Sequence, residues 1–304
     1  MPTDGLMALP TPSLYTAHGG LQLAADTVEA IGGEFHGQIL LFPGAGQTRH
    51  AWRRSAHTFA TGGFDVTSFD LRGHGASAWA ADGDYSIDAF VGDVRAILKR
   101  MIRPVTLVGA SIGGIAAVIA LGERVSDENF DEKVRSLVLV DVVPTMSKSG
   151  LDHIRSFMSL GSSGFADLEE AAAAVASFLP HRPPRKSNSS LMKNLRQGHD
   201  GRLYWHWDPA FHADSQRRAE SGMFERMARA AAGVRVPTLI VSGTQSEVVN
   251  RTGIDELLAS MTNAQAIEVR DASHMVAGDN NEDFVASILE FLRRQRMSLP
   301  DASV

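Results

Sequence analysis

The stretch LVGASIGGIAA, residues 107–117, decides the fold of this 304-residue chain. It begins with β-branched and apolar residues and continues as Ala- and Gly-rich sequence, with Ser111 between the two parts. The surrounding uncharged run, residues 104–122, is about as long as a membrane span. Its change of character halfway favours a short buried strand, a sharp turn and a buried helix over one span. We therefore expect no membrane-spanning segment here.

Other short apolar runs are typical of buried parallel strands. Together with residues 105–110, they are residues 38–42, 64–70, 136–142, 237–243 and 264–270. Helical patterns separate most of these runs, as in residues 86–101, which begin with an N-cap serine, and residues 281–295. Strands that alternate with helices indicate an α/β fold, with a mostly parallel central sheet covered by helices on both faces. Residues around 14–36 predict an antiparallel hairpin at one sheet edge.

The alternation stops between residues 144 and 232, where we find no clear strand. This segment holds Ala-rich helical sequence at 165–179, a loop with Pro and Arg at 180–190 and an aromatic patch at 204–211. We interpret residues 144–232 as a helical cap inserted between two strands of one core. Residues 1–143 and 233–304 would then form that core.

Composition excludes several classes of protein. The formal net charge of −6 argues against a nucleic-acid partner. Because the chain has no cysteine, it has no disulfide, no thiol nucleophile and no cysteine-bound metal. Its first twenty residues lack the pattern of a secretory signal, so we expect a cytoplasmic protein. The histidine spacing matches no metal site and the glycines match no phosphate loop, so we expect neither metal nor cofactor.

The pentapeptide Gly109-Ala110-Ser111-Ile112-Gly113 has the form G-x-S-x-G and lies between the expected strand and helix. Such a turn strains the serine backbone and projects its hydroxyl at the carboxyl edge of the sheet. Two backbone N–H groups would stabilise an oxyanion there. We assign one to Ile112 and the other to Ala45, in the loop PGAGQTRHAW at residues 43–52, where Gly44 and Gly46 allow the turn.

A serine nucleophile needs a base and an acid, which follow it in the chain in this arrangement. His274, in DASHMV at residues 271–276, follows the last expected strand and is our candidate base. Glu247, in the loop after residues 237–243, is our first candidate for the acid. Asp141, at the end of the strand 136–142, is the alternative, because an acid there also reaches the histidine.

With these motifs, the chain resembles the α/β-hydrolase fold superfamily, in the serine-nucleophile branch with a helical cap. The matching motifs are PGAGQTRHAW (43–52), FDLRGHGAS (69–77), GASIGG (109–114), SGTQSEVV (242–249) and DASHMV (271–276). The resemblance implies a hydrolase that uses Ser111, Glu247 and His274. Relatives usually carry His-Gly where this chain has Pro43-Gly44, and mostly aspartate at the position of Glu247. We interpret Arg72 to Gly75 as a structural turn near the site.

The leading hypothesis is hydrolysis of a small-molecule carboxylic ester by a monomer or homodimer. Residues 144–232 carry twelve Lys or Arg and nine Asp or Glu, which would suit an ester with a free carboxylate or would form a solvated surface. The aromatic residues at 205–207 would suit an aromatic ester or would fix the cap to the core. The candidate substrate-binding residues are Gly44, Phe157, Met158, Trp205, His206 and Trp207. The alternatives are a C–C bond hydrolase of ring-fission diketones, a cofactor-free peroxidase or perhydrolase, and a ligand receptor on the same fold.

Overall fold

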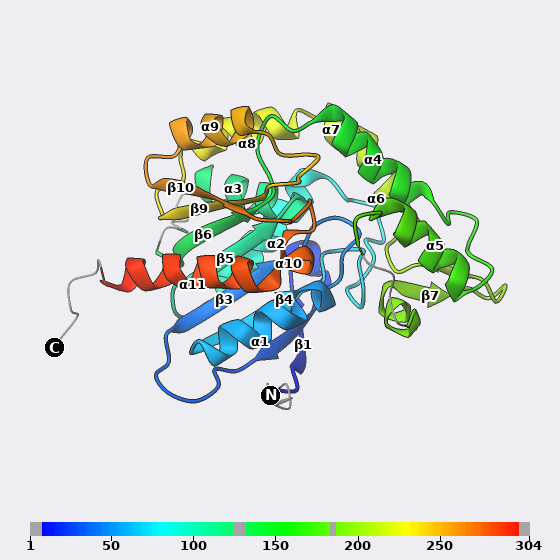
Figure 1. Ribbon diagram of the computed structural model, residues 1–304, viewed down its shortest axis with the longest axis horizontal. Coiled ribbons are helices and arrows are strands. Elements are labelled where there is room, and N and C mark those ends of the chain that lie inside the picture. Colours follow the sequence, from blue (N-terminus) through cyan, green and yellow to red (C-terminus); the bar gives the residue numbers. More distant parts are fainter. Residues whose placement is uncertain (1–7, 124–129, 131, 183–186, 298–304) are drawn as a thin grey trace.

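The central feature of the computed structural model is one eight-stranded sheet (Figure 1). The structure describes residues 8–123, 130, 132–182 and 187–297. The strand order across the sheet is β1-β2-β4-β3-β5-β6-β9-β10. The strands are β1 (Thr11–Thr16), β2 (Gln22–Val28), β3 (Gly37–Phe42), β4 (Phe64–Phe69), β5 (Val105–Ala110), β6 (Val134–Val140), β9 (Thr238–Gly243) and β10 (Ala264–Val269).

The sheet confirms the predicted α/β architecture. Strands β3 to β6, β9 and β10 pair in parallel, and each coincides with one of the six expected apolar runs. Strands β1 and β2 form the antiparallel hairpin at one edge, and β2 also runs antiparallel to β4. In parallel strands, the carboxyl ends meet at one edge, so the loops after β3, β5, β6 and β10 lie together there.

Helices cover both faces of the sheet (Figure 1). One face packs against α1 (Arg53–Thr61) and α11 (Asn281–Met297). The other packs against α2 (Ile87–Arg100), α3 (Ile112–Gly122), α8 (Met223–Ala231) and α9 (Arg251–Ser260). Short helical turns complete the core: η1 (His18–Gly20), η2 (Arg49–Trp52) and α10 (Val276–Asp279).

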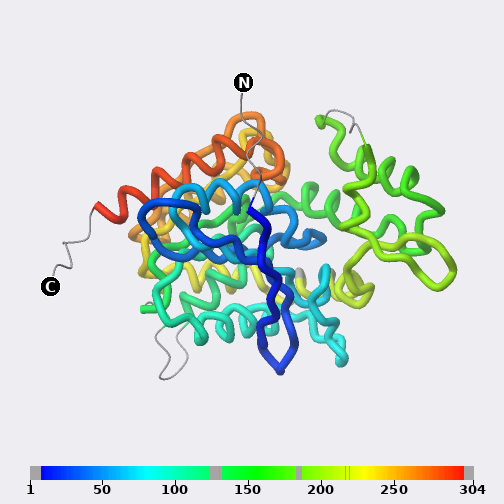
Figure 2. Tube along the Cα trace, turned by 90° about the horizontal axis from the view of Figure 1, so that it is seen from below, coloured from blue at the N-terminus to red at the C-terminus, as the bar shows by residue number. Residues whose placement is uncertain are grey.

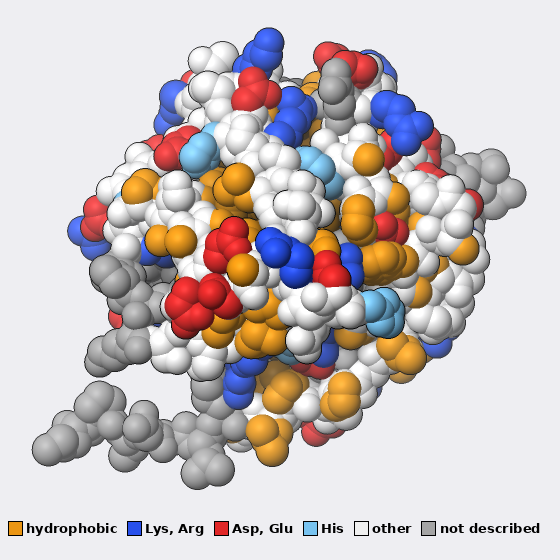
Figure 3. All heavy atoms as spheres, turned by 90° about the vertical axis from the view of Figure 1, so that its right-hand side faces the viewer, with side chains coloured by type: hydrophobic (Ala, Val, Ile, Leu, Met, Phe, Trp, Pro, Cys, Tyr) orange, Lys and Arg blue, Asp and Glu red, His pale blue; other side chains and the backbone are white. Residues whose placement is uncertain are grey.

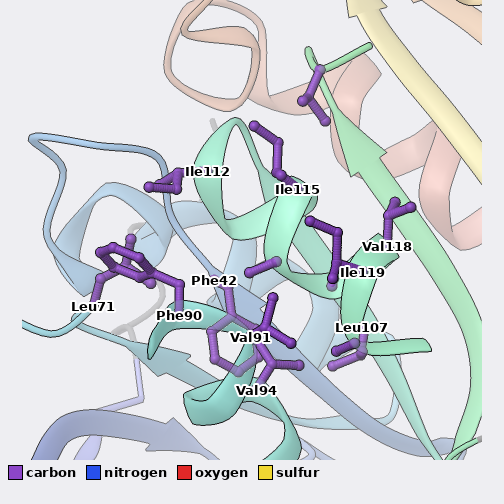
Figure 4. Close-up of a cluster of buried hydrophobic side chains, with 14 of the residues drawn as sticks. Phe42, Leu71, Phe90, Val91, Val94, Leu107, Ile112, Ile115, Val118 and Ile119 are labelled. Carbon is purple, nitrogen blue, oxygen red and sulfur yellow. The ribbon is translucent and has the colours of Figure 1, made fainter. Parts of the chain in front are cut away.

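The uncharged run that contains Ser111 forms β5, a sharp turn and α3. Every residue of α3 before Gly122 is buried, since β5 and β6 lie on one side and α2 and α8 on the other. Figure 4 shows Ile119 of this helix near Leu107 of β5, and both belong to one buried cluster with Ile115, Val91 and Val94. Among the described residues, no helix is long and apolar enough to cross a membrane.

The packing around α3 predicts a large loss of stability on truncation of Ile119, which is fully buried. Replacement by alanine leaves a cavity and removes buried apolar surface, so Ile119→Ala should lower the free energy of unfolding by about 2–5 kcal/mol. Ile102→Ala is the matched control, because Ile102 is 92% exposed and its loss should cost less than about 0.5 kcal/mol. Urea denaturation measures both values. Equal effects in the two variants would contradict this packing.

The segment between β6 and β9 contains α4 (Lys148–Ser159), α5 (Leu168–Phe178), η3 (Ser189–Asn194), β7 (Leu195–Gln197), β8 (Leu203–Trp205), α6 (Pro209–Ala213), α7 (Ser215–Glu220) and α8. We call residues 144–222 of it the inserted segment. Figure 2 shows the part from α4 to β8 standing beside the sheet. In contrast, α8 packs against α3 on the core face.

The inserted segment contains an antiparallel hairpin, formed by β7 and β8, where we predicted no strand. Its turn contains Gly201, with a φ of 81°, a conformation that glycine adopts without strain. Each strand is only three residues long, too short to produce a recognisable alternation of polar and apolar residues.

Candidate active site

Ser111 occupies a strained turn between β5 and α3. Its φ of 48° and ψ of −121° lie outside the regions that non-glycine residues favour. The turn is possible because its neighbours are small: a Cβ added at Gly113 would lie 2.7 Å from the carbonyl oxygens of Phe42 and Pro43. The sequence therefore forces the serine to the carboxyl edge of the sheet, at the N-terminus of a helix.

His274 lies in the loop after β10 and is paired with a buried carboxylate. Its Nδ1 is 2.7 Å from Oδ2 of Asp141, which directly follows β6. The Asp141 side chain is fully buried and also accepts hydrogen bonds from the Ser246 hydroxyl, at 2.7 Å, and the Gly243 N–H, at 3.2 Å. These two donors hold the carboxylate in place against the imidazole.

Glu247, our first candidate for the acid, lies elsewhere. Its side chain is exposed, and its backbone carbonyl packs against Gly150 of α4. The geometry therefore favours the alternative acid, Asp141. The physical reason is local: Asp141 follows β6 with a left-handed φ of 49°, and donors from Gly243 and Ser246 hold its carboxylate where His274 Nδ1 meets it. Ser246, which the sequence analysis missed, occupies the position in the β9 loop that faces this carboxylate.

The loop after β3 crosses directly over Ser111. A Cβ added at Gly44 would lie 3.2 Å from the Cβ of Ser111. The Gln47 N–H donates to the Gly44 carbonyl, at 3.2 Å, and Gly46 has a φ of 73°, so residues 44–47 form a tight turn with Ala45 at its second position. Within the described residues, the Ala45 N–H has no acceptor. The Ile112 N–H is the first of α3, where intrahelical acceptors are lacking.

A cavity of about 490 Å³ opens above Ser111 and His274. Its base comes from the loops of the core, and its opposite wall comes from the inserted segment. The apolar residues that the inserted segment contributes are Ile154, Phe157, Met158, Val175, Phe178, Leu179, Leu191, Trp205 and Trp207. Trp205 and Trp207 stack with their ring centroids 5.1 Å apart, and Phe157 stacks on Phe178 at 4.2 Å.

Of the proposed substrate-binding residues, five line the cavity: Gly44, Phe157, Met158, Trp205 and Trp207. His206 does not, and its buried ring instead faces the loops of the core. Ser111 and His274 both line the cavity. Within the described residues, no hydrogen bond joins the Ser111 hydroxyl to the imidazole. Such contacts often tighten only when substrate binds.

An ion pair connects the inserted segment to the histidine loop. Arg182 lines the cavity and its Nε lies 2.7 Å from Oδ1 of Asp279. The other oxygen of Asp279 accepts from the hydroxyl and N–H of Ser273, the residue before His274. Burial opposes ionisation of Asp279, but the Ser273 hydrogen bonds and the Arg182 charge lower its pKa. The wall of the cavity is thereby anchored beside the imidazole.

Comparison with known proteins identifies the class of this fold and site. The model of the alpha/beta hydrolase family matches residues 39–287. The chain therefore belongs to the alpha/beta hydrolase family, as its motifs predict.

Individual relatives agree with this assignment. The chain is 29% identical over 244 residues to the 3-hydroxybutyrate-oligomer hydrolase of Cupriavidus necator, covering 74% of this chain and 80% of that protein. It is 26% identical over 250 residues to the esterase Rv0045c of Mycobacterium tuberculosis, covering 80% and 78%. The crystal structure of E-2-(acetamidomethylene)succinate hydrolase superposes with a TM-score of 0.77 at 21% identity, over 93% of this chain and 99% of that one.

Proposed function

We propose that this member of the hydrolase family is a serine esterase whose triad is Ser111, His274 and Asp141. The observation that carries the proposal is the buried Asp141 carboxylate on His274 Nδ1, because it leaves the opposite ring nitrogen to accept a proton. Ser111 stands at the same cavity, on the strained turn that exposes a nucleophile. The relatives named as an esterase and an oligomer hydrolase support ester cleavage as the reaction.

In this mechanism, the Ser111 hydroxyl attacks the ester carbonyl carbon while His274 Nε2 takes its proton. The Ala45 and Ile112 N–H groups bind the oxyanion that develops on the carbonyl oxygen. His274 then returns the proton to the departing alkoxide, so an alcohol leaves and an acyl group stays on Ser111. Water, deprotonated by the same histidine, releases the acid and restores the serine. Asp141 keeps the Nδ1 proton in place and stabilises the imidazolium at both stages.

The part of the inserted segment from α4 to β8 serves as the cap of the enzyme. Residues 154–158 of α4 and 175–179 at the end of α5 supply much of the apolar lining opposite Ser111, so they exclude water from the reacting ester. The cap proposed from the sequence, residues 144–232, thus divides into a portion over the cavity and α8, which packs on the core.

A labelling experiment tests the proposal directly. A fluorophosphonate should modify the protein at one serine, and peptide mass spectrometry should place the label on Ser111. A panel of p-nitrophenyl esters, monoesters of diacids, ring-fission diketones and peroxide substrates then defines the reaction. Turnover of diketones without ester turnover would replace the esterase by a C–C hydrolase, and tight binding without turnover would indicate a receptor. Turnover of peroxide substrates alone would indicate a perhydrolase.

The substrate class follows from the charge of the cavity. Arg54, Lys193 and Arg182 line it, whereas no Asp or Glu lies among its described lining residues. Arg182 is neutralised by Asp279, but Arg54 and Lys193 form no ion pair with a carboxylate in the part of the chain that the structure describes. The outer face of the molecule on this side mixes basic and acidic side chains (Figure 3), so the bias is local to the cavity.

An apolar cavity with two uncompensated cations suits an ester that also carries a free carboxylate. His50 adds no charge at neutral pH, since burial and the adjacent Arg49 lower its pKa. The name of one relative refers to oligomers of 3-hydroxybutyrate, itself a carboxylate, which agrees with this class. The enzyme therefore acts on esters with an apolar body and an anionic end.

This charge pattern predicts discrimination between a diacid monoester and the corresponding neutral diester. The double variant Arg54→Ala/Lys193→Ala should raise KM for the monoester about three- to tenfold, since exposed ion contacts contribute up to about 1 kcal/mol each. KM for the diester should stay constant. Arg100→Ala, which removes a cation outside the cavity lining, is the control. Salt at 0.5 M should erase the preference. A parallel rise in KM for both esters would refute charge recognition.

A further inference from the structure

Two buried histidines lie close to the site but outside the proposed reaction. His74 follows β4 in the turn of Arg72 to Gly75, and His206 follows β8 in the inserted segment. They are 0% and 5% exposed, and their ring centroids lie 5.7 Å apart. Neither lines the cavity. Buried imidazoles require hydrogen-bond partners, and the partners here are informative.

Both histidines bind the backbone of the same residue, Gly46. The Gly46 N–H donates to His74 Nε2 at 3.1 Å, so the His74 proton is on Nδ1, which donates to the Arg72 carbonyl at 2.9 Å. The Gly75 N–H donates to His206 Nδ1 at 2.8 Å. The His206 proton is therefore on Nε2, which donates to the Gly46 carbonyl at 3.2 Å.

Each ring thus acts as one donor and one acceptor, an arrangement that only neutral imidazole provides. Burial lowers the pKa of His74 to about 3 and that of His206 to about 4. Both rings consequently remain neutral, and keep their tautomers, at the pH at which His274 must act as a base.

Gly46, which both histidines bind, belongs to the turn that carries the Ala45 N–H of the proposed oxyanion hole. Gly46 follows Ala45 in the turn of residues 44–47, and its φ of 73° is one of many backbone conformations open to glycine, so contacts from outside the turn are needed to select it. Pro43, just before the turn, has no N–H with which to anchor it. Side chains from outside the turn hold both peptide groups that flank the Cα of Gly46. The second of these groups contains the Gln47 N–H, which bonds the Gly44 carbonyl and so orients the peptide that carries the Ala45 N–H.

We propose that His74 and His206 are positioning residues for the oxyanion hole, and that the inserted segment supplies one of them. The inference rests on the esterase proposal, because it assigns the Ala45 N–H to oxyanion binding. It also explains why His206 faces away from the cavity while Trp205 and Trp207 line it.

Two conservative substitutions separate the contact of His206 with Gly46 from its contact with Gly75. The amide of Gln reaches the position of Nε2, so His206→Gln keeps a donor for the Gly46 carbonyl and loses the Gly75 contact. The amide of Asn reaches the position of Nδ1, so His206→Asn keeps the Gly75 contact and releases Gly46. We expect kcat within about threefold of wild type for His206→Gln, and a 10- to 100-fold lower kcat with unchanged KM for His206→Asn.

A binding measurement distinguishes positioning from a general loss of structure. A substrate-like trifluoromethyl ketone, which forms a tetrahedral adduct on Ser111, should bind His206→Asn more weakly by the same factor as the loss in kcat/KM, while the carboxylic acid product binds equally. The same Gln and Asn pair at His74 repeats the test if a His206 variant fails to fold. Equal activity in the Gln and Asn variants would overturn the inference. A wild-type enzyme without ester turnover would instead refute the esterase proposal, and this inference with it.

Discussion

Replacement of Ser111 by alanine should lower kcat for ester hydrolysis by about 10⁴- to 10⁶-fold, because the proposed acyl-enzyme forms on its hydroxyl. Residual turnover should reflect only the oxyanion donors and substrate binding. Stopped or discontinuous assays with a p-nitrophenyl ester measure the loss, and the fluorophosphonate label should disappear with it.

The Ser111→Ala variant should remain folded, so its loss in kcat will report on catalysis and not on stability. Alanine keeps the Cβ, so the strained backbone at Ser111 is unchanged, and the hydroxyl makes no hydrogen bond within the described structure. Its thermal unfolding should match that of the wild type closely. A folded Ser111→Ala protein that retains more than a few per cent of kcat would exclude Ser111 as the nucleophile.

Exchange of Asp141 for asparagine should lower kcat by about 10⁴-fold, as expected when the orienting acid of such a triad becomes an amide. The amide would donate to His274 Nδ1 and so favour the tautomer with its proton on Nε2. That proton would occupy the nitrogen that must accept one from Ser111. The pH dependence of kcat/KM should change as well, since the imidazolium loses its stabilising charge.

Glu247→Gln is the matched control for this substitution, because it removes one carboxylate from the neighbouring loop. Its exposed side chain predicts kcat within about twofold of wild type. Urea denaturation of Asp141→Asn is needed alongside, since the buried side chain also accepts from Gly243 and Ser246. If Glu247→Gln inactivates the enzyme and Asp141→Asn does not, the assignment of the acid is reversed.

The central strands of the sheet were predictable from the sequence because they are buried on both faces. Each of β3, β5 and β9 is a continuous apolar run between turn residues, a pattern that few other structures produce. The position of Ser111 was predictable for a related reason: only small residues at 109 and 113 permit the turn that follows such a strand.

The choice between Asp141 and Glu247 depends on a tertiary distance, which local sequence does not encode. Both residues follow strands that end at the same sheet edge, and the β6 loop and the β9 loop are neighbours. The left-handed backbone of Asp141, with a φ of 49°, turns its carboxylate toward His274. Nothing in the residues around position 141 indicates that conformation.

The orientation of His206 is different, since a local signal existed. Successive side chains alternate along a strand, and here the alternation continues past the end of β8: Trp205 and Trp207 line the cavity, whereas His206 contacts the core. The prediction treated the aromatic patch at residues 204–211 as one unit and so missed this alternation. Applied residue by residue, it would have separated the cavity wall from the contact with the core.

The contacts of the residues after His206 restrict which part of the cap can be replaced by that of another protein. The Asp208 N–H donates to the Gly73 carbonyl at 2.8 Å, its carboxylate accepts from the Tyr85 hydroxyl at 2.5 Å, and Arg218 donates to the Tyr85 carbonyl at 3.1 Å. Residues 206–218 are thus attached to the core by hydrogen bonds and cannot be exchanged together with the rest of the cap. A chimera that imports a foreign cap should be joined within residues 144–205, and we expect any movement that admits substrate to occur in α4 and α5.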